Sequence, residues 1–302
     1  MNHKLRPFTA RAVQHIYQKS IDGGVVFYNV VDRIVFCSVV CVMAERYGIT
    51  ILMSAIMFTH LHHSLIANMK SKMSKFMQDA TSVYARLHNC HYGRKGSLFH
   101  DTFGSAAKTS EKKIRENLAY VANNHVEKGL CKHAVDERWT FLPYYRNGFP
   151  FSEPITLEKA SQQLTYAMRF VARRRKQKKY LKYSDWYSIT IGLNHVEIEQ
   201  LIDYTISTYL YVDFDKAIEF YGDFETMVSA FDSVVGAEHD IKEEYYRFSD
   251  QEYVRIGKIL KEKGWSPRKI YEASRDEKVK MANVLMNRYQ IDGLALRKYM
   301  HL

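Results

Sequence analysis

Residues 49–67 read ITILMSAIMFTHLHHSLIA, which divides into two short apolar runs. Short apolar runs bounded by polar or turn-type residues are typical of strands, so we expect strands at Ile49–Phe58 and Leu61–Ala67. Residues two apart in a strand share a face, so His60 and His62 would present their imidazoles side by side. The pair is a minimal set of metal ligands, although two core histidines would fit the same pattern.

The segments on either side of this stretch alternate between strand and helix patterns. A β-branched run after the Gly23-Gly24 turn indicates a strand, and Asp32 is placed to cap the apolar helix that follows. Further on, apolar residues recur every three or four positions, which indicates a long amphipathic helix. We therefore expect strands at 24–30, 49–58, 61–67 and 94–107, and helices at 32–48, 69–92 and 110–128. The order β-α-β-β-α-β-α predicts an α+β fold.

Residues 143–154 hold three of the five prolines of the chain, which is typical of a domain boundary. We expect a first domain at 1–145 and an all-α region at 155–302. Helical patterns in that region cover 157–183, 194–211 and 250–263. The segment 250–302 resembles a small helix-turn-helix, a motif whose later helix can enter a DNA major groove. Short helices joined by glycine turns also occur in any helical bundle.

The net charge of the chain is +11, from 44 Lys and Arg against 33 Asp and Glu. Residues 212–248 hold ten acidic and three basic residues, a charge of −7, so the remainder carries +18. A positive excess of this size favours a polyanionic partner, nucleic acid first, over an ordinary charged surface. The role of the acidic stretch stays open. With 46% hydrophobic residues, 14 glycines and 5 prolines, the composition excludes a disordered or collagen-like chain.

The sequence also indicates compartment and redox chemistry. The four cysteines show neither metal-site nor disulfide-framework spacing, and we expect them to be buried thiols. The polar, basic start has no signal-peptide pattern. The uncharged stretch 47–69 is interrupted by His60, His62 and His63, so we reject it as a membrane span. We expect a cytoplasmic protein.

The expected helix 110–128 carries a second candidate group. Its apolar stripe runs through Ile114, Leu118, Val121 and His125. At about 100° per residue, Tyr120 and Asn124 lie roughly 90–130° off this stripe, one turn apart on a shared face. A phenol and an amide that point together away from the stripe indicate a site, and a surface tyrosine is the plain alternative.

Three runs of sequence together resemble the single-tyrosine HUH transposases, and within that superfamily the transposases associated with repetitive extragenic palindromes (REP). The runs are residues 49–62, GSLFH at 96–100 and LAYVANNHVEKG at 118–129. The resemblance covers roughly residues 15–135. Joint occurrence of the runs is much more specific than any one of them.

Two family motifs can be placed residue by residue. The M-P-N-H-hydrophobic-H motif, whose histidines bind a divalent metal, corresponds to MFTHLH at 57–62. The Y-hydrophobic-x-x-N-P motif, whose tyrosine is the nucleophile, corresponds to YVANNH at 120–125. This chain departs from the pattern at Phe58 and Thr59, which replace Pro-Asn, and at His125, which replaces the final proline.

The resemblance implies a ferredoxin-like antiparallel sheet and metal-dependent cleavage of single-stranded or hairpin DNA without ATP. Tyr120 would form a 5′-phosphotyrosyl link, and His60 and His62 would hold the metal. Asn124 faces the same way as Tyr120 and could complete the metal sphere, whose oxygen-rich remainder favours Mg²⁺ or Mn²⁺. The departures leave open a domesticated DNA-binding protein that no longer cleaves. The resemblance is also compatible with a homodimer, and it suggests a location at the nucleoid.

A dense run of cations lies in the second half of the chain, with tyrosines and a tryptophan close by. Cations interleaved with aromatic residues suit phosphate contacts and base stacking, whereas a solvated helix face is the ordinary alternative. Arg94 and Lys95 are further candidates near the first domain. The run consists of Arg173, Arg174, Arg175, Lys176, Lys178, Lys179 and Lys182.

Overall fold

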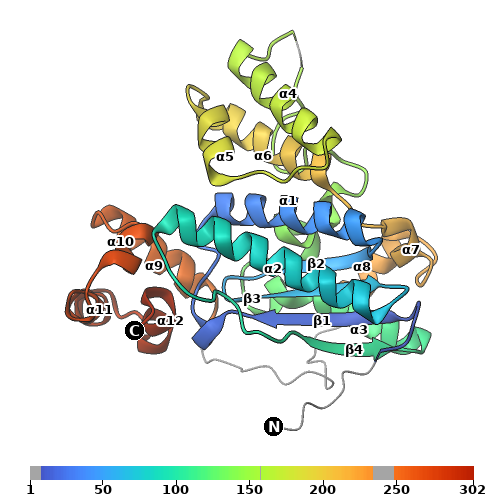
Figure 1. Ribbon diagram of the computed structural model, residues 1–302, viewed down its shortest axis with the longest axis horizontal. Helices are drawn as coiled ribbons and strands as arrows, with labels where there is room; N and C mark the ends of the chain where they lie inside the picture. The colour runs from blue at the N-terminus through green and yellow to red at the C-terminus, as the bar shows by residue number, and fades with distance from the viewer. Residues whose placement is uncertain (1–7, 157, 234–247) are drawn as a thin grey trace.

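The computed structural model describes residues 8–156, 158–233 and 248–302 (Figure 1). Four strands form one antiparallel sheet in the order β2-β3-β1-β4. They are β1 (Val13–Lys19), β2 (Thr50–Ile56), β3 (His60–Ile66) and β4 (Gly104–Lys108). Helices α1 (Val30–Tyr47) and α2 (Lys70–Tyr92) connect the strands, and α3 (Glu111–Glu127) follows β4. This β-α-β-β-α-β order and sheet order are ferredoxin-like, which confirms the expected α+β class.

The stretch 49–67 forms the hairpin of β2 and β3, as expected. The strands pair antiparallel from Thr50 opposite Ile66 to Ile56 opposite Leu61. The turn between them is closed by the Met57 N–H, which donates to the His60 carbonyl at 3.0 Å. The uncharged stretch is therefore a buried hairpin. Among the described residues, no helix combines the length and the hydropathy needed to cross a membrane.

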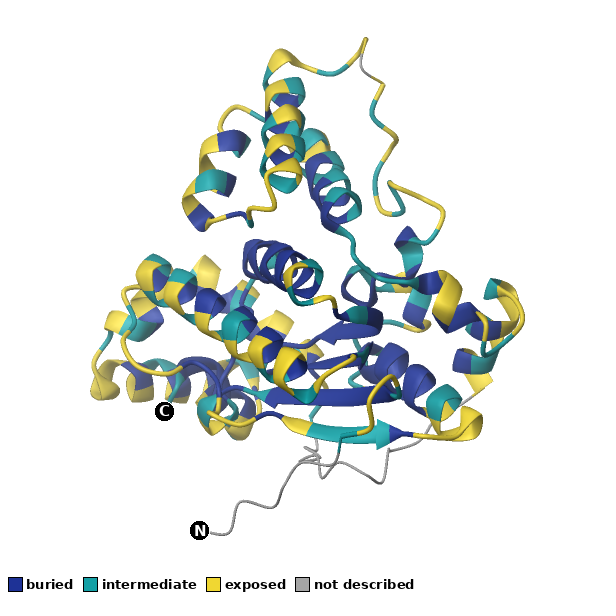
Figure 2. Ribbon diagram, turned by 45° about the vertical axis from the view of Figure 1, so that its right-hand side comes forward, coloured by how far each residue is buried: buried dark blue, intermediate teal, exposed yellow. Residues whose placement is uncertain are grey.

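Helix α1 is buried along almost its whole length, which Figure 2 shows in dark blue. Asn29 is its N-cap, and Asp32 is the third helical residue, whose carboxylate accepts from the Asn29 N–H at 3.0 Å. The helix ends at Tyr47 and is followed by Gly48, whose φ of 63° places it in the left-handed region. The prediction that Asp32 caps the helix is thus corrected to a capping box shared with Asn29.

The first expected strand, 24–30, is wrong. Residues 24–28 are an extended connection, and their N–H groups pair with other parts of the chain: Val26 donates to the Phe58 carbonyl and Val25 to the Lys298 carbonyl. The real first strand is β1, VQHIYQK, which lies between β3 and β4. Its histidine and glutamines interrupt the apolar pattern, so hydropathy does not predict this strand. The fold nevertheless buries these polar side chains. The expected strand at 94–107 likewise shortens to Gly104–Lys108.

The second half of the chain is helical, as expected, with shorter helices than the patterns suggested. The helices are α4 (Gln162–Lys176), α5 (Tyr183–Thr190), α6 (His195–Tyr209), α7 (Phe214–Ile218), α8 (Phe224–Ser233), α9 (Gln251–Glu262), α10 (Pro267–Glu272), α11 (Arg275–Tyr289) and α12 (Gly293–Met300). Four short 3₁₀ helices complete the described elements: η1 (Ile21–Gly23), η2 (Ala134–Asp136), η3 (Arg138–Thr140) and η4 (Leu142–Tyr144).

The boundary predicted at 143–154 does not separate two hydrophobic cores. Helices α4 to α8 share one core with the first 145 residues, and α4 to α6 lie beyond α1, on the side away from the sheet (Figure 1). Helices α9 to α12 form a second core. The reason is α1, whose apolar surface on all sides must be covered from both directions.

The C-terminal bundle, α9 to α12, docks on the connection that precedes α1. Val25, Tyr28 and Phe58 belong to its core. The His301 Nε2 lies 2.7 Å from the Tyr28 hydroxyl and 3.1 Å from the Val25 carbonyl. Gly24 permits this approach, since a Cβ there would lie 2.5 Å from the His301 ring. The contacts of His301 therefore join the C-terminal bundle to the connection at residues 24–28.

A buried carboxylate joins three layers of the fold near this docking surface. Asp32 accepts hydrogen bonds from the Tyr183 hydroxyl at 2.6 Å and the Tyr92 hydroxyl at 2.9 Å. Burial raises the pKa of Asp32 to about 6, while these hydrogen bonds oppose the shift. His88 is fully buried nearby, and its ring lies 4.7 Å from that of Tyr92.

We expect His88→Phe to reduce the acid sensitivity of folding. Burial lowers the pKa of His88 to about 3, so between pH 3 and 6.5 the unfolded chain binds the proton more readily and stability falls as pH falls. From pH 7 to pH 5 the variant should lose about 2 kcal/mol less than the wild type. Urea unfolding at both pH values measures this.

The exposed His195 provides the control for that experiment. His195→Gln should keep the pH dependence of the wild type, because His195 is exposed and the substitution changes no buried group. Equal losses for the wild type and His88→Phe would contradict a neutral, buried His88.

Candidate active site

Tyr120 and the two predicted histidines lie in one cluster between the sheet and α3. The Tyr120 ring centroid lies 5.6 Å from that of His62 and 5.5 Å from that of His15. The rings of His60 and His62 are 5.1 Å apart and nearly perpendicular. The structure thus brings together residues that are 58 positions apart in the sequence, while the roles assigned to them stay predictions.

Strand alternation selects which histidines enter the cluster. His60 and His62 point to the α3 face of the sheet, opposite Lys19 and Tyr17 of β1. His63 points to the other face, where its Nδ1 is 2.6 Å from the Ser54 hydroxyl and its ring lies near Phe76 of α2. Burial lowers the pKa of His63 to about 3. Its exclusion from the site follows from the period of two in a strand.

Two members of the cluster, His15 and Tyr17, were missed by the sequence reasoning. The His15 Nε2 lies 2.9 Å from the His62 Nδ1, so one ring donates to the other. Tyr17 stacks on His62 at 4.7 Å between ring centroids. Both belong to β1, which hydropathy did not reveal. The signal was the alternation in VQHIYQK, which places His15 and Tyr17 on one face.

The residues that depart from the family motifs have structural partners here. The Thr59 hydroxyl lies 3.0 Å from the His60 Nδ1 and so orients that ring. Phe58 stacks under the Arg33 guanidinium at 4.5 Å and packs on Tyr253 of the C-terminal bundle. The His125 Nε2–H donates to the Ile56 carbonyl at 3.2 Å, which ties α3 to β2. Burial lowers the pKa of His125, which keeps it neutral.

Asn124 is buried one turn beyond Tyr120. Its amide Nδ2 donates to the Tyr120 carbonyl at 2.9 Å, so the amide oxygen is the atom that could bind a ligand. Within the residues that the structure describes, no group of three or more His, Cys, Asp or Glu side chains is arranged to hold a metal ion. The candidate donors are therefore two imidazoles and one amide oxygen.

A pocket of about 200 Å³ opens above His60. Tyr17 and His60 line it, whereas Tyr120, which is 5% exposed, is not among its lining residues. The C-terminal bundle contributes to its wall. The lining residues are Tyr17, Lys19, Asp22, Gly23, Thr59, His60, His100, Lys128, Asp250, Tyr253 and Lys298.

The basic run at 173–182 is not part of this cluster. It covers the end of α4 and the following connection, beyond α1 and on the far side of the sheet from α3 (Figures 1 and 2). Arg175 and Lys178 pair with Glu45 of α1, and Arg174 pairs with Asp185 of α5 at 3.1 Å. The exposed members are Arg173, Lys176, Lys178, Lys179 and Lys182. Part of the run therefore fastens α4 to α1 and α5.

Arg94 and Lys95 follow the end of α2 and do not line the pocket above His60. The Arg94 guanidinium donates to the carbonyls of Gly96 and Ser97 at 3.0 and 2.7 Å, and it shapes this connection. Lys95 is exposed. Of the two, Lys95 is the better placed to contact a ligand.

The acidic stretch 212–248 is described as far as residue 233, and 234–247 lie outside the described residues. In the described part, carboxylates mostly serve local structure. Asp213 and Asp223 cap α7 and α8, accepting from the N–H groups of Lys216 and Thr226. Asp232 pairs with His133 at 3.0 Å. Helix α8 packs on α3, where the Asn123 amide donates to the Phe231 carbonyl.

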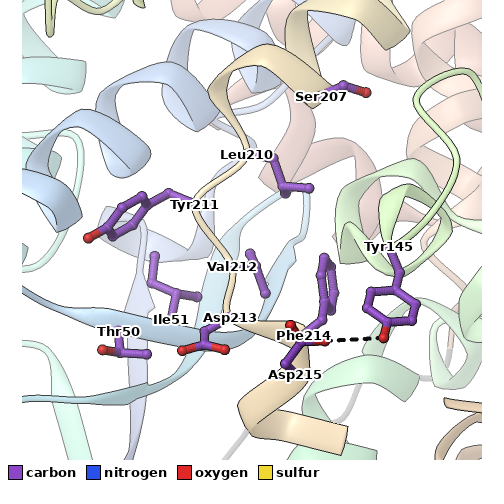
Figure 3. A pocket seen from close by; sticks show the side chains of 10 residues that line it. All are labelled: Thr50, Ile51, Tyr145, Ser207, Leu210, Tyr211, Val212, Asp213, Phe214 and Asp215. Atoms are coloured by element: carbon purple, nitrogen blue, oxygen red, sulfur yellow. Dashed lines mark hydrogen bonds between the residues drawn. The ribbon is translucent and has the colours of Figure 1, made fainter. Parts of the chain in front are cut away.

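A second cavity, of about 570 Å³, lies between the start of β2 and the segment joining α6 to α7 (Figure 3). The Tyr145 hydroxyl donates to Asp215 at 3.2 Å at one side of it. Within the part of the chain that the structure describes, no lysine, arginine or histidine lines it, so this lining lacks the groups needed to hold a phosphate. Its lining residues are Thr50, Ile51, Tyr145, Ser207, Leu210, Tyr211, Val212, Asp213, Phe214 and Asp215.

No protein-family model and no curated protein matches this sequence. Among solved structures, the chain is similar to a REP-associated tyrosine transposase bound to a REP hairpin. The identity is 15%, and the match covers 54% of this chain and 98% of the other, with a TM-score of 0.39. This is the group of proteins that the motifs at 57–62 and 120–125 resemble.

Proposed function

We propose that this protein is a metal-dependent single-strand DNA endonuclease and strand transferase, a transposase that acts on hairpin-containing DNA through a 5′-phosphotyrosine intermediate. The observation that carries the proposal is the contact of the Tyr120 ring with His62 and His15, beside His60 and its lysine-lined pocket. A phenol among imidazoles has the groups needed to attack a phosphodiester.

In the proposed reaction the Tyr120 oxygen attacks phosphorus, and the bond from phosphorus to the 3′-oxygen breaks. The phenol loses its proton, and the released 3′-oxygen gains one. His15 and His62 are the imidazoles whose rings lie next to the phenol, and they are joined by a 2.9 Å hydrogen bond. Because His62 is also the proposed metal ligand and its Nδ1 bonds to His15, His15 is the group that we assign to hold the proton of the phenol.

His60 and His62 are the residues that would hold a divalent metal, with the Asn124 amide oxygen as a third donor. Their Nδ1 atoms bond to Thr59 and His15, which is how metal-binding histidines are oriented through their second nitrogen. Water and phosphate oxygens would complete the set, which suits Mg²⁺ or, with two imidazoles, Mn²⁺. When bound, the ion would polarise a phosphate oxygen and neutralise developing charge.

A second candidate is a DNA-binding protein of the same fold that does not cleave. The observation in its favour is the burial of Tyr120, which is 5% exposed and does not line the pocket above His60. In this form the cluster would be a packed core of aromatic rings. Covalent adduct formation separates the two functions.

We expect Tyr120→Phe to abolish a covalent adduct and keep DNA affinity, because the change removes one hydroxyl and leaves the ring in place. The measurement is denaturing gel electrophoresis of protein incubated with labelled hairpin oligonucleotides and Mn²⁺. Tyr166→Phe, at an exposed position of α4, serves as the control.

Two results would contradict this assignment. An adduct that persists in Tyr120→Phe and disappears in Tyr17→Phe would identify Tyr17 of β1 as the nucleophile in place of Tyr120. Wild-type protein that binds the hairpin DNA but forms no adduct across a range of sequences would establish the non-cleaving alternative.

We expect Thr59→Val to weaken Mn²⁺ binding about 10-fold, since second-sphere partners of histidine ligands typically contribute this much. Valine keeps the shape of threonine and removes the hydroxyl that holds the His60 Nδ1. Thr59→Ser should bind Mn²⁺ like the wild type because it retains the hydroxyl. Isothermal titration calorimetry measures all three, and a wild type that binds no Mn²⁺ would refute the metal assignment.

The basic run offers a matched pair of variants. Neutralising the exposed Arg173, Lys176 and Lys179 should reduce the slope of log affinity against log salt by up to about 2, from roughly 0.7 per single-strand phosphate contact. Neutralising Arg174 and Arg175 should mainly lower the melting temperature, because it removes ion pairs to Asp185 and Glu45.

Fluorescence anisotropy at several salt concentrations and thermal unfolding measure the two effects. An unchanged salt slope in the first variant would identify the run as an ordinary solvated face.

A further inference from the structure

The pocket above His60 is built from two parts of the chain that are distant in sequence. Lys19, at the end of β1, and Lys128, directly after α3, come from the sheet domain. Lys298 and Asp250 come from the C-terminal bundle, where Asp250 precedes α9 and Lys298 lies in α12. The bundle therefore forms a wall of the pocket that adjoins the histidine cluster.

Direct contacts hold the two parts together at this pocket. The Asp250 N–H and the Ser249 hydroxyl both donate to the Lys128 carbonyl, at 3.0 and 2.7 Å. The Lys298 ammonium is 3.5 Å from the Gly23 carbonyl, and the Lys298 carbonyl accepts from the Val25 N–H at 3.0 Å. The side chains of the bundle are thus held in position relative to His60.

The charges around the pocket suit a single negative charge. Three lysines face two carboxylates, Asp22 and Asp250, which leaves an excess of one positive charge among these side chains before any metal on His60 is counted. Lys298 is 9% exposed and Asp250 is 6% exposed. Buried lysines keep their charge best when an anion is close.

Asp250 is a second sign that a ligand belongs here. Among the described residues, its buried Oδ2 has no hydrogen-bond partner, and burial raises the pKa of its carboxyl to about 6, against the opposing effect of Lys128, Arg33 and Lys298. A buried acceptor of this kind is costly unless a donor reaches it. The 3′-hydroxyl released by the proposed cleavage, or a bound water, would supply that donor.

The size of the pocket limits the ligand. At about 200 Å³ it is smaller than the roughly 300–1,000 Å³ of sites that enclose whole small molecules. A backbone phosphate with part of its sugar fits this volume, whereas a complete nucleotide with its base does not.

We propose that this pocket binds one backbone phosphodiester of the DNA strand next to the His60–Tyr120 cluster, and that Lys298 makes the C-terminal bundle part of the active centre. The inference rests on the proposed function for the identity of the strand. The bundle then acts through a phosphate contact beside the site, whether or not α11 also contacts a major groove.

The test is a scan of single methylphosphonate substitutions along the hairpin oligonucleotide. Each substitution removes the charge of one phosphate. Protein carrying Tyr120→Phe is used for binding, so that cleavage does not interfere. In the Tyr120→Phe protein that retains Lys298, we expect one position at which the methylphosphonate weakens binding about 10-fold. Fluorescence anisotropy gives the affinities.

Lys298→Met removes the ammonium and keeps the aliphatic stem. We expect it to weaken binding of the unmodified oligonucleotide about 10-fold and to abolish the effect of the methylphosphonate at that one position. Lys128→Met, from the other wall, should show the same loss at the same position. Because Lys128 lies outside the bundle, this result would show that misfolding of the bundle does not cause the loss. Lys159→Met, at an exposed position before α4, should keep the profile of the wild type.

The outcomes separate this inference from the proposed cleavage. If both lysine variants keep the positional effect of the wild type, or if no position is sensitive, the phosphate pocket is refuted even where a Tyr120 adduct forms. If the positional effect disappears in both variants but Tyr120 forms no adduct, the pocket is supported and the cleavage activity is refuted.

Discussion

The burial of α1 on every side is the constraint on which the rest of the structure depends. A helix without a polar face must be covered in all directions, and here the sheet and α2 cover one side while α4 to α6 cover the other. The Leu181 N–H donates to the Ser38 hydroxyl on α1, and Arg175 and Lys178 pair with Glu45 near its end. The basic run therefore belongs to a layer separated from Tyr120 by α1 and the sheet.

The position of β3 between β1 and β2 gives the candidate site its geometry. Both neighbours hold the strand in register, so alternate side chains are directed to opposite layers. His60 and His62 meet α3, and His63 meets α2. Within this frame, Thr59 and His15 hold the rings of His60 and His62 through their Nδ1 atoms. These hydrogen bonds thus fix the orientation of the two imidazole rings, which the strand geometry alone does not determine.

The C-terminal bundle depends on the connection at 24–28, which has no regular structure of its own. Backbone groups there pair with Phe58 and Lys298, and Gly24 leaves room for the His301 ring. Phe58, which departs from the family motif, contributes to the same contact. Docking of this kind explains why a helical segment at the end of the chain reaches the pocket above His60.

The sequence by itself determined the elements whose signals are local. The hairpin at 49–67, the helices α2 and α3 and the shared face of His60 and His62 follow from periods of two and 3.6 residues. The spacing of the two motifs also anticipated that Tyr120 and His62 lie close together. The assigned roles of Tyr120, His60, His62 and Asn124 stay proposals that the experiments above address.

Only the tertiary structure decided the remainder, because those features depend on partners distant in the sequence. Strand β1 is polar in composition and becomes a strand only when β3 and β4 pair with it on both sides, which brings His15 and Tyr17 into the cluster. The partners of Arg174, Arg175 and Lys178 lie on other helices, so the sequence shows a basic run where the structure shows ion pairs. The pocket above His60 needs Lys298, 238 positions away, and no local pattern encodes a contact of that length.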